Sequence, residues 1–115
     1  LPELLLFTDG LPLLAHNAAF DMGVLRASAA AVSFDLPNLS YGCTLLMSRK
    51  TYNLDSYRLN AVAYAIGHEE FAHHDALADA DACARIALDM ANRHEVESLD
   101  ELLIKTKQRF KPLLV

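Results

Sequence analysis

Apolar and polar positions along the chain form short apolar runs that alternate with longer blocks of helical periodicity. The apolar runs at 11–15 and 41–47 are bounded by turn residues, so they predict two buried strands. Strands that alternate with helices indicate a parallel α/β arrangement. Because two strands do not make a stable sheet alone, we expect part of the sheet to lie outside this sequence or to come from another chain.

The helical blocks carry start and stop signals. Asn17 is a good N-cap for one helix, Gly67 stops a second, and Ser98 and Glu101 have capping-box spacing at the start of a last one. The expected helices cover residues 3–7, 18 to about 31, 57–66, 75 or 76 to about 91, and 98–110. In the second of these helices, the apolar stripe expected to face the core comprises Phe20, Val24, Ala27 and Ala31.

The composition fits one folded domain. The chain has 115 residues, of which 53% are hydrophobic, so it can bury a core. Asp9, His16 and Asp21 interrupt the N-terminal apolar stretch, which excludes a membrane span there, and the opening residues carry no secretory signal. We therefore expect a cytoplasmic protein with no membrane partner. Its two cysteines, Cys43 and Cys83, are expected to be free buried thiols, with a disulfide as the alternative.

The formal net charge of −5 argues against a protein that coats nucleic acid generally, since such proteins are basic. It is compatible with an enzyme that holds cations in an acidic pocket and touches a few phosphates. The sequence opens at Leu1, without methionine, at what looks like the end of a helix. We therefore expect a fragment or a processed piece.

A first candidate site lies where the apolar run at 11–15 ends and a helix begins. Asp21 is expected in the opening turn of that helix, at the carboxyl end of a strand, where open α/β sheets place their sites. The helix N-terminus stabilises a charged carboxylate there. The alternative is that Asp21 only complements the helix dipole, that Asn17 is only a cap and that His16 is a structural histidine.

A second candidate site combines His74 with Asp79, five residues later, at the start of an alanine-rich helix. With His74 in the preceding loop, its imidazole is free to act as a general base, while the helix holds Asp79 as a metal ligand. Asp79 shares a stripe with apolar positions, and a metal would offset the cost of burying its charge. That stripe continues through Cys83, Ile86 and Met90, whereas the aspartates expected on exposed positions are Asp75, Asp81 and Asp89.

The histidines of this region also allow a different metal site. The stretch 68–73 resembles the HExxH motif of zinc proteases, but its spacing is one residue too long, so the two histidines fall on different helix faces. A loop site for another metal, built from His68, His73 and His74, stays an alternative. So does a loop whose histidines bind nothing.

Together, the two segments resemble the DEDDh family of 3′–5′ exonucleases, of the type of the proofreading epsilon subunit of bacterial DNA polymerase III. The family's second motif is similar to the stretch 16–21, and its third motif, a histidine and an aspartate separated by four residues, is similar to 74–79. The elements around 43–45 and 57–59 also lie where the family has similar ones. The resemblance covers residues 1–92 and implies the C-terminal portion of an α/β, RNase H-like exonuclease domain, with a helical tail at 93–115.

The resemblance implies two divalent cations, Mg²⁺ or Mn²⁺, held by four carboxylates. Asp21 and Asp79 would be two of these ligands, and His74 would deprotonate the attacking water. The residues similar to the second motif, His16, Asn17 and Phe20, would contact the substrate. That substrate would be the 3′ end of single-stranded nucleic acid, DNA rather than RNA, and a DNA polymerase subunit would be a further partner.

The family's first motif, an aspartate and a glutamate two residues apart on the first strand, is absent from this chain. We therefore expect the N-terminal strands to be missing, and we expect a chain with two of four carboxylates to bind metal weakly and turn over little. An RNA 3′-end exonuclease of the same fold and a non-catalytic interaction module stay alternatives. So does phosphate contact or polymerase docking by the basic tail, which contains Lys105, Lys107, Arg109 and Lys111.

Overall fold

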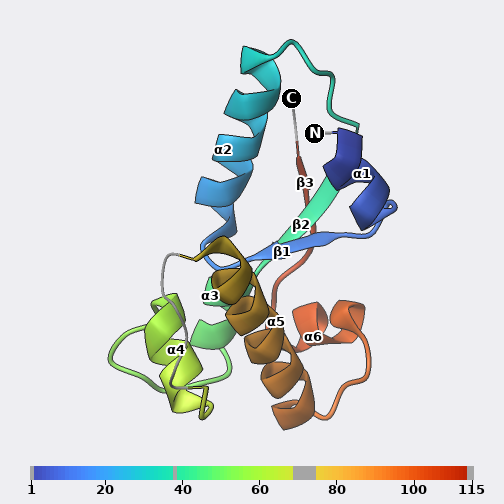
Figure 1. Ribbon diagram of the computed structural model, residues 1–115. Coiled ribbons are helices and arrows are strands. Elements are labelled where there is room, and N and C mark those ends of the chain that lie inside the picture. The colour runs from blue at the N-terminus through green and yellow to red at the C-terminus, as the bar shows by residue number, and fades with distance from the viewer. Residues whose placement is uncertain (1, 38, 69–74, 114–115) are drawn as a thin grey trace.

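A mixed three-stranded sheet lies at the centre of the protein (Figure 1). The computed structural model describes residues 2–37, 39–68 and 75–113. The elements are α1 (Pro2–Thr8), β1 (Leu13–Ala15), α2 (Ala18–Ala31), β2 (Leu39–Cys43), α3 (Thr44–Arg49), α4 (Leu59–Ala65), α5 (Ala76–Arg93), α6 (Leu99–Lys105) and β3 (Lys111–Leu113). β1 runs parallel to β2, which confirms the expected parallel α/β pair, and β3 runs antiparallel on the other edge of β2.

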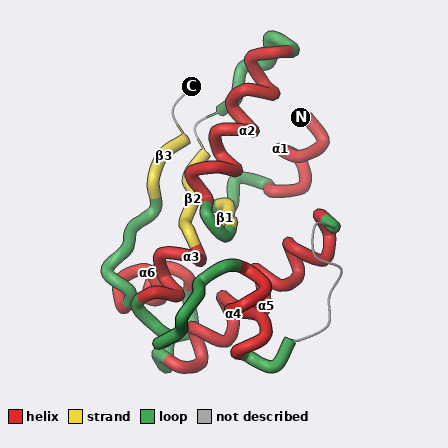
Figure 2. Tube along the Cα trace, turned by 90° about the vertical axis from the view of Figure 1, so that its left-hand side faces the viewer, coloured by secondary structure: helices red, strands yellow, loops and turns green. Residues whose placement is uncertain are grey.

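Two hydrophobic clusters fill the two ends of the molecule. Figure 2 shows α3, α4, α5 and α6 gathered at one end and α1 and α2 at the other, with β2 and β3 extending alongside α2. At the α2 end, Met22 and Ala29 pack against Leu36, Leu39 and Leu113. The larger cluster, among the other helices, consists of Met47, Val62, Ala63, Ala82, Ile86, Met90, Leu102 and Leu103. Between the clusters, β1 passes into α2 and β2 passes into α3, so the ends of both parallel strands meet there.

The bounds of α2 agree with the prediction, but its buried face is the opposite one. The predicted stripe is on the outside, with Phe20 69% and Val24 52% exposed. The helix instead buries Ala18, Met22 and Ala29. Both faces of this helix are apolar or small, so periodicity alone does not select one. The face with Ala18, Met22 and Ala29 is the one that packs toward β1 and β2.

The second strand begins and ends earlier than predicted. The apolar run expected as a strand over 41–47 is split, because β2 ends at Cys43 and α3 starts directly at Thr44. A short apolar run is compatible with either a buried strand or a buried helix turn, and here Thr44 and Met47 are fully buried as helical residues. The carboxyl end of β2 therefore leads without a loop into a helix that packs against α5.

The last helix is shorter than predicted. It ends at Lys105, where the hydroxyl of the buried Thr106 donates to the carbonyl oxygens of Leu102 and Leu103. Lys107 then takes a positive φ of 58°, a conformation that glycine usually marks in a sequence. The chain reverses and forms β3, a strand that the sequence did not predict, in register with Leu39 at Leu113.

The remaining helix signals are confirmed. Gly67 follows α4 with a φ of 89°, and the Ser98 side chain accepts a hydrogen bond from the Glu101 amide at 3.1 Å. The long helix α5 buries Cys83, Ile86 and Met90, as its predicted stripe requires. Among the described helices, none is both long enough and apolar enough to cross a membrane.

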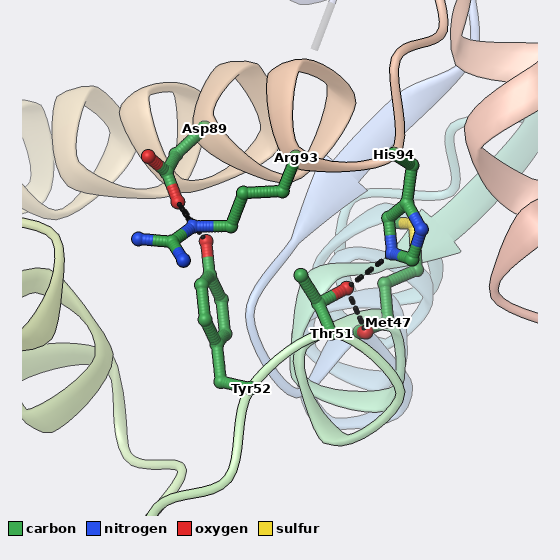
Figure 3. A network of polar contacts seen from close by, with 6 residues as sticks. All are labelled: Met47, Thr51, Tyr52, Asp89, Arg93 and His94. Atoms are coloured by element: carbon green, nitrogen blue, oxygen red, sulfur yellow. Dashed lines mark hydrogen bonds and ion pairs between the residues drawn. The ribbon is translucent and has the colours of Figure 1, made fainter.

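A polar clasp joins the irregular segment after α3 to the C-terminal half of α5 (Figure 3). The hydroxyl of Tyr52 donates to Asp89 at 2.5 Å, and Arg93 donates to the same oxygen at 2.6 Å while its guanidinium lies over the Tyr52 ring. Thr51 donates to the Met47 carbonyl at 2.9 Å. The prediction of Asp89 as a merely exposed acid was therefore wrong, because its carboxylate is the centre of this clasp.

Ile86 is fully buried in the larger cluster, so Ile86→Ala should lower the free energy of unfolding by about 2–5 kcal/mol through lost apolar burial and a residual cavity. Leu88→Ala is the matched control, since Leu88 lies on the same helix and is 71% exposed. It should change the free energy by less than about 0.5 kcal/mol. Urea denaturation measures both changes, and equal losses would contradict this assignment of the buried face.

Candidate functional site

A cavity opens where β1 meets the starts of α2 and α5. Its polar residues are Asp21, Asp79, His16 and Cys83. The rest of its lining is apolar and mostly small, consisting of Leu14, Ala15, Leu59, Ala76, Ala80 and Ala84. The fold therefore brings the two predicted metal carboxylates, which are far apart in the sequence, to one cavity.

Asp21 lies in the first turn of α2, as predicted. β1 ends at Ala15, so the carboxyl end of this strand delivers the following helix and its aspartate to the cavity. Partial burial raises the pKa of Asp21, whereas a backbone hydrogen bond and the nearby His16 lower it. A divalent cation in the cavity would favour the charged form of the Asp21 carboxylate and would therefore lower its pKa again.

Asp79 lies in the first turn of α5 and is half-buried. The helix starts at Ala76 because the carboxylate of Asp75 caps it, accepting from the amide of Leu77 at 3.0 Å. Ala76 and Ala80 line the cavity beside Asp79, and their side chains end at Cβ. Small neighbours thus leave space next to this carboxylate, in agreement with the alanine-rich pattern.

His16 has protein partners at both ring nitrogens. Nε2 lies 2.5 Å from the carbonyl oxygen of Tyr57, and Nδ1 lies 2.9 Å from the hydroxyl oxygen of Thr44. A carbonyl oxygen only accepts, so Nε2 carries the proton and donates it. Burial lowers the pKa of His16, although the Tyr57 bond and the charge of Asp21 act in the other direction. The ring is therefore neutral near neutral pH, and Nδ1 accepts from Thr44.

The Thr44 hydroxyl extends this contact to α5. Its single hydrogen goes to His16, so its oxygen accepts from the thiol of Cys83, 3.4 Å away. Burial raises the pKa of Cys83, which keeps the thiol protonated for this bond. Cys83 lies about one turn after Asp79. The chain His16–Thr44–Cys83, called the His16 bridge below, thus joins the strand end beside Asp21 to the helix turn beside Asp79.

The start of α2 is not capped as predicted. Asn17 occupies the N-cap position with a φ of 69°, but its side chain makes no capping hydrogen bond. The amide of Ala18 donates instead to the sulfur of Cys43 at 3.3 Å. Both cysteines are free, as expected. Their contacts were missed because thiols are weak hydrogen-bonding groups with no local spacing signal.

Of the three residues predicted to contact substrate, His16 lines the cavity, Asn17 is exposed and lines a neighbouring cavity, and Phe20 is exposed and lines neither. Their predicted role in substrate binding stays a prediction. His74, the predicted base, lies outside the described residues, so its role also stays a prediction.

The alternative site of loop histidines rests mainly on residues outside the described chain, since His73 and His74 are not described. Nε2 of His68 lies 3.8 Å from a carboxylate oxygen of Asp81. Across residues 2–37, 39–68 and 75–113, no three histidine, cysteine, aspartate or glutamate residues are grouped as a complete metal site. Asp21 and Asp79 fit part of a metal centre, as two of four carboxylates would.

The family model described as Exonuclease, RNase T, matches residues 1–87 of this chain. The chain belongs to this family, the DEDDh exonucleases. Its α/β architecture, with a three-stranded mixed sheet, fits part of the RNase H-like exonuclease fold. The family and fold class that the sequence predicted are thereby confirmed.

Curated relatives agree with this assignment. A PolC-type DNA polymerase III from Caldanaerobacter subterraneus is 33% identical over 116 residues, covering 100% of this chain and 8% of that protein. The PolC-type DNA polymerase III of Thermotoga maritima is 32% identical over 108 residues, covering 89% of this chain and 8% of that protein. A Mycobacterium tuberculosis protein, whose name describes a bifunctional exonuclease/endonuclease, is 36% identical over 85 residues. The match covers 71% of this chain and 13% of that protein. The chain thus spans a small part of these relatives. No solved structure matches it at a significant level.

Thr44→Val keeps the shape of a buried side chain but removes the hydroxyl, so His16 loses a donor and Cys83 an acceptor. We expect a loss of about 1–3 kcal/mol in the free energy of unfolding. Thr44→Ser keeps the hydroxyl and loses one methyl group, at about 1 kcal/mol, and should keep the Nε2–H tautomer of His16. Nitrogen NMR of the imidazole reports the tautomer; identical His16 spectra in the two variants would contradict the Thr44 bond.

His16 should make the protein less stable in mild acid. Because its folded pKa lies below the ordinary value of 6.5, the unfolded chain takes up a proton that the folded chain refuses. Its stabilising contribution is complete above 6.5 and is lost as the pH falls from there toward the folded pKa. Denaturation at about pH 7.5 and about pH 5.5 should show this loss. The variant His16→Gln should lose less stability than the parent between these two pH values. An equal loss in parent and variant would contradict the assignment of this pH dependence to His16.

Proposed function

We propose that this chain is the metal-binding C-terminal part of a cytoplasmic 3′–5′ exonuclease. It would hydrolyse phosphodiester bonds at the 3′ ends of single-stranded DNA and release nucleoside 5′-monophosphates. The observation that carries the proposal is the convergence of Asp21 and Asp79 on one cavity. Membership of the exonuclease family supports the reaction class, and the names of the PolC-type relatives support DNA and a polymerase partner.

Asp21 and Asp79 would hold Mg²⁺ or Mn²⁺. Carboxylate oxygens are the ligands that these hard cations prefer. The alanines that line the cavity leave space beside Asp79, and the half-buried position of that residue favours a cation as its counter-charge. The donor set therefore fits the cations that the family implies, as part of a larger set of ligands.

When bound, a pair of divalent cations activates a water and stabilises the leaving 3′ oxygen. His74 would take the proton of the attacking water, for which a pKa near neutrality is suited. In the sequence it immediately precedes Asp75, the residue that caps the helix carrying Asp79. His16 is poorly suited to this role, because both of its nitrogens already have protein partners.

The remaining carboxylates would come from a strand paired with the other edge of β1. In the described sheet β1 pairs only with β2, so its second edge is available. The end of β1 contributes Ala15, followed by His16, to the lining of the cavity. A strand along this edge would therefore carry its own side chains toward Asp21 and Asp79.

We propose that residues 1–92 form the exonuclease portion and that 93–115 form a tail that stabilises it. Leu102 and Leu103 of α6 are buried in the larger cluster, and Leu113 of β3 is buried against α2. The tail contributes no residue to the lining of the acidic cavity.

Asp21→Asn and Asp79→Asn should each weaken Mn²⁺ binding at least tenfold, or about 1.4 kcal/mol, because each removes a charged ligand at nearly constant shape. Isothermal titration calorimetry measures the affinity. Asp81→Asn is the matched control, since Asp81 is exposed on the same helix and pairs with Arg85 outside the cavity. Unchanged Mn²⁺ affinity in both cavity variants would remove the proposed site.

A companion assay follows labelled mononucleotides released from a 3′-labelled single-stranded DNA with Mn²⁺. Turnover should be low with two of the four carboxylates, and His74→Ala and Asp21→Asn should abolish what there is. The same assay with RNA of equal sequence separates the two substrate classes. Faster release from RNA would favour the alternative of an RNA exonuclease.

A further inference from the structure

Two further cavities follow the acidic one, each adjacent to the one before it. The second is lined by Arg49, Ser56, Arg58 and Asn60, and it shares His16 and Leu59 with the acidic cavity. The third is lined by Gln108, Arg109 and Lys111, and it shares Asn17 and Leu45 with the second. Shared lining residues make the three cavities neighbours in one series.

The charge of the lining changes sign along this series. The acidic cavity has Asp21 and Asp79, the second cavity has two arginines against one acid, Asp55, and the third has Arg109 and Lys111 with no acid. This order is unexpected in a chain with a net charge of −5. Positive charge is thus concentrated in the second and third cavities, which lie away from the candidate metal site.

These four cations are available to a ligand. Two other arginines of the described chain are neutralised by ion pairs, Arg85 by Asp81 and Arg93 by Asp89. Within the described residues, Arg49, Arg58, Arg109 and Lys111 form no salt bridge. Asn60, Ser56 and Gln108 add neutral hydrogen-bonding groups beside them.

The fold, not the sequence, brings these cations together. Arg49 ends α3, which continues directly from β2, and Arg58 immediately precedes α4. Lys111 opens β3 and lies opposite Tyr41 of β2 in the antiparallel register. Because β2 leads into α3 on one side and pairs with β3 on the other, the tail and the middle of the chain supply cations to the same region.

We propose that the three cavities form one track for the sugar-phosphate backbone of a single nucleic-acid strand. Its 3′ end would enter the acidic cavity, and its 5′ direction would run past Arg49 and Arg58 to Arg109 and Lys111. A positively charged groove that follows the backbone is how proteins hold single strands without reading sequence. The cations also offset the repulsion that Asp21 and Asp79 exert on a phosphate. This inference rests on the proposed function and names the surface that holds its substrate.

Binding of fluorescein-labelled oligothymidylate, followed by fluorescence anisotropy in EDTA over a range of NaCl concentrations, tests the track without metal or turnover. For single strands, log affinity falls with log salt by about 0.7 for each phosphate neutralised. The double variants Arg49→Gln/Arg58→Gln and Arg109→Gln/Lys111→Gln should therefore each lower the slope by about 1.4. The matched control is Lys50→Gln/Lys105→Gln, which removes equal charge from exposed residues outside the three cavities and should keep the slope.

The length of the oligonucleotide tests the order of the track. With about 4 nucleotides, the Arg109/Lys111 variant should bind like the parent, whereas with about 12 it should bind more weakly. The Arg49/Arg58 variant should be weaker at both lengths. Unchanged slopes, a control that loses as much as the track variants, or equal competition by polyglutamate would each overturn the proposal.

Asp21→Asn separates this inference from the proposed function. In EDTA it should bind the oligonucleotide at least as well as the parent, because it removes a negative charge, while it loses affinity for Mn²⁺. Normal Mn²⁺ binding with an unchanged salt slope in the track variants would overturn the track alone. Loss of the slope in those variants, with Mn²⁺ affinity unaffected by either aspartate variant, would overturn the metal site alone.

Discussion

The two hydrogen bonds of the neutral His16 ring are the constraint on which the arrangement of the site depends. One ring nitrogen donates to the carbonyl of Tyr57, and the other accepts from Thr44, which in turn accepts from Cys83. These partners belong to the loop before α4, to α3 and to α5. A protonated ring would have no lone pair for Thr44, and the loss of either ring nitrogen would remove a hydrogen bond that joins these elements. Burial of the ring is therefore also what keeps the bridge in one hydrogen-bonding direction.

The clasp on α5 holds the other end of the same loop. Tyr52 binds Asp89 in the C-terminal half of α5, and Thr51 binds His94, the residue that directly follows this helix. The Tyr57 hydroxyl donates to the Tyr52 carbonyl at 2.8 Å. The segment between α3 and α4, which has no regular structure, is thus fixed at both ends. Its Tyr57 carbonyl is placed for His16 by bonds that start some distance away on α5. The hydrophobic cluster beneath, with Met47, Ile86 and Met90, supplies the bulk of the stability, while these polar contacts select one position of the loop.

The sequence predicts the parts of the fold that local signals determine. The bounds of α2 and the stripe of α5 follow from periodicity, and Asp21 and Asp79 follow from helix starts beside a strand end. The His16 bridge was not predictable, because its members are bonded across 28 and 39 positions of the chain. The same holds for β3, whose pairing with β2 is non-local and whose preceding turn uses Lys107 where glycine would have marked it. Burial of one face of α2 over the other is likewise decided by packing against the strands.

A chain with a net negative charge would face electrostatic repulsion from the polyanion proposed as its substrate, and the distribution of its charges offers a way to offset this repulsion. Acidic groups gathered in one cavity attract cations but repel phosphate until those cations are bound. Arginines and a lysine in the adjoining cavities, which form no ion pair among the described residues, would let a strand be held by its backbone while its terminal phosphate reaches the acidic end. Asp81 and Asp89 are paired with Arg85 and Arg93 on α5, which keeps these two acids from competing for the cations of the cavities. On this reasoning the local order of charge along the cavities, and not the net charge, decides whether a single strand binds.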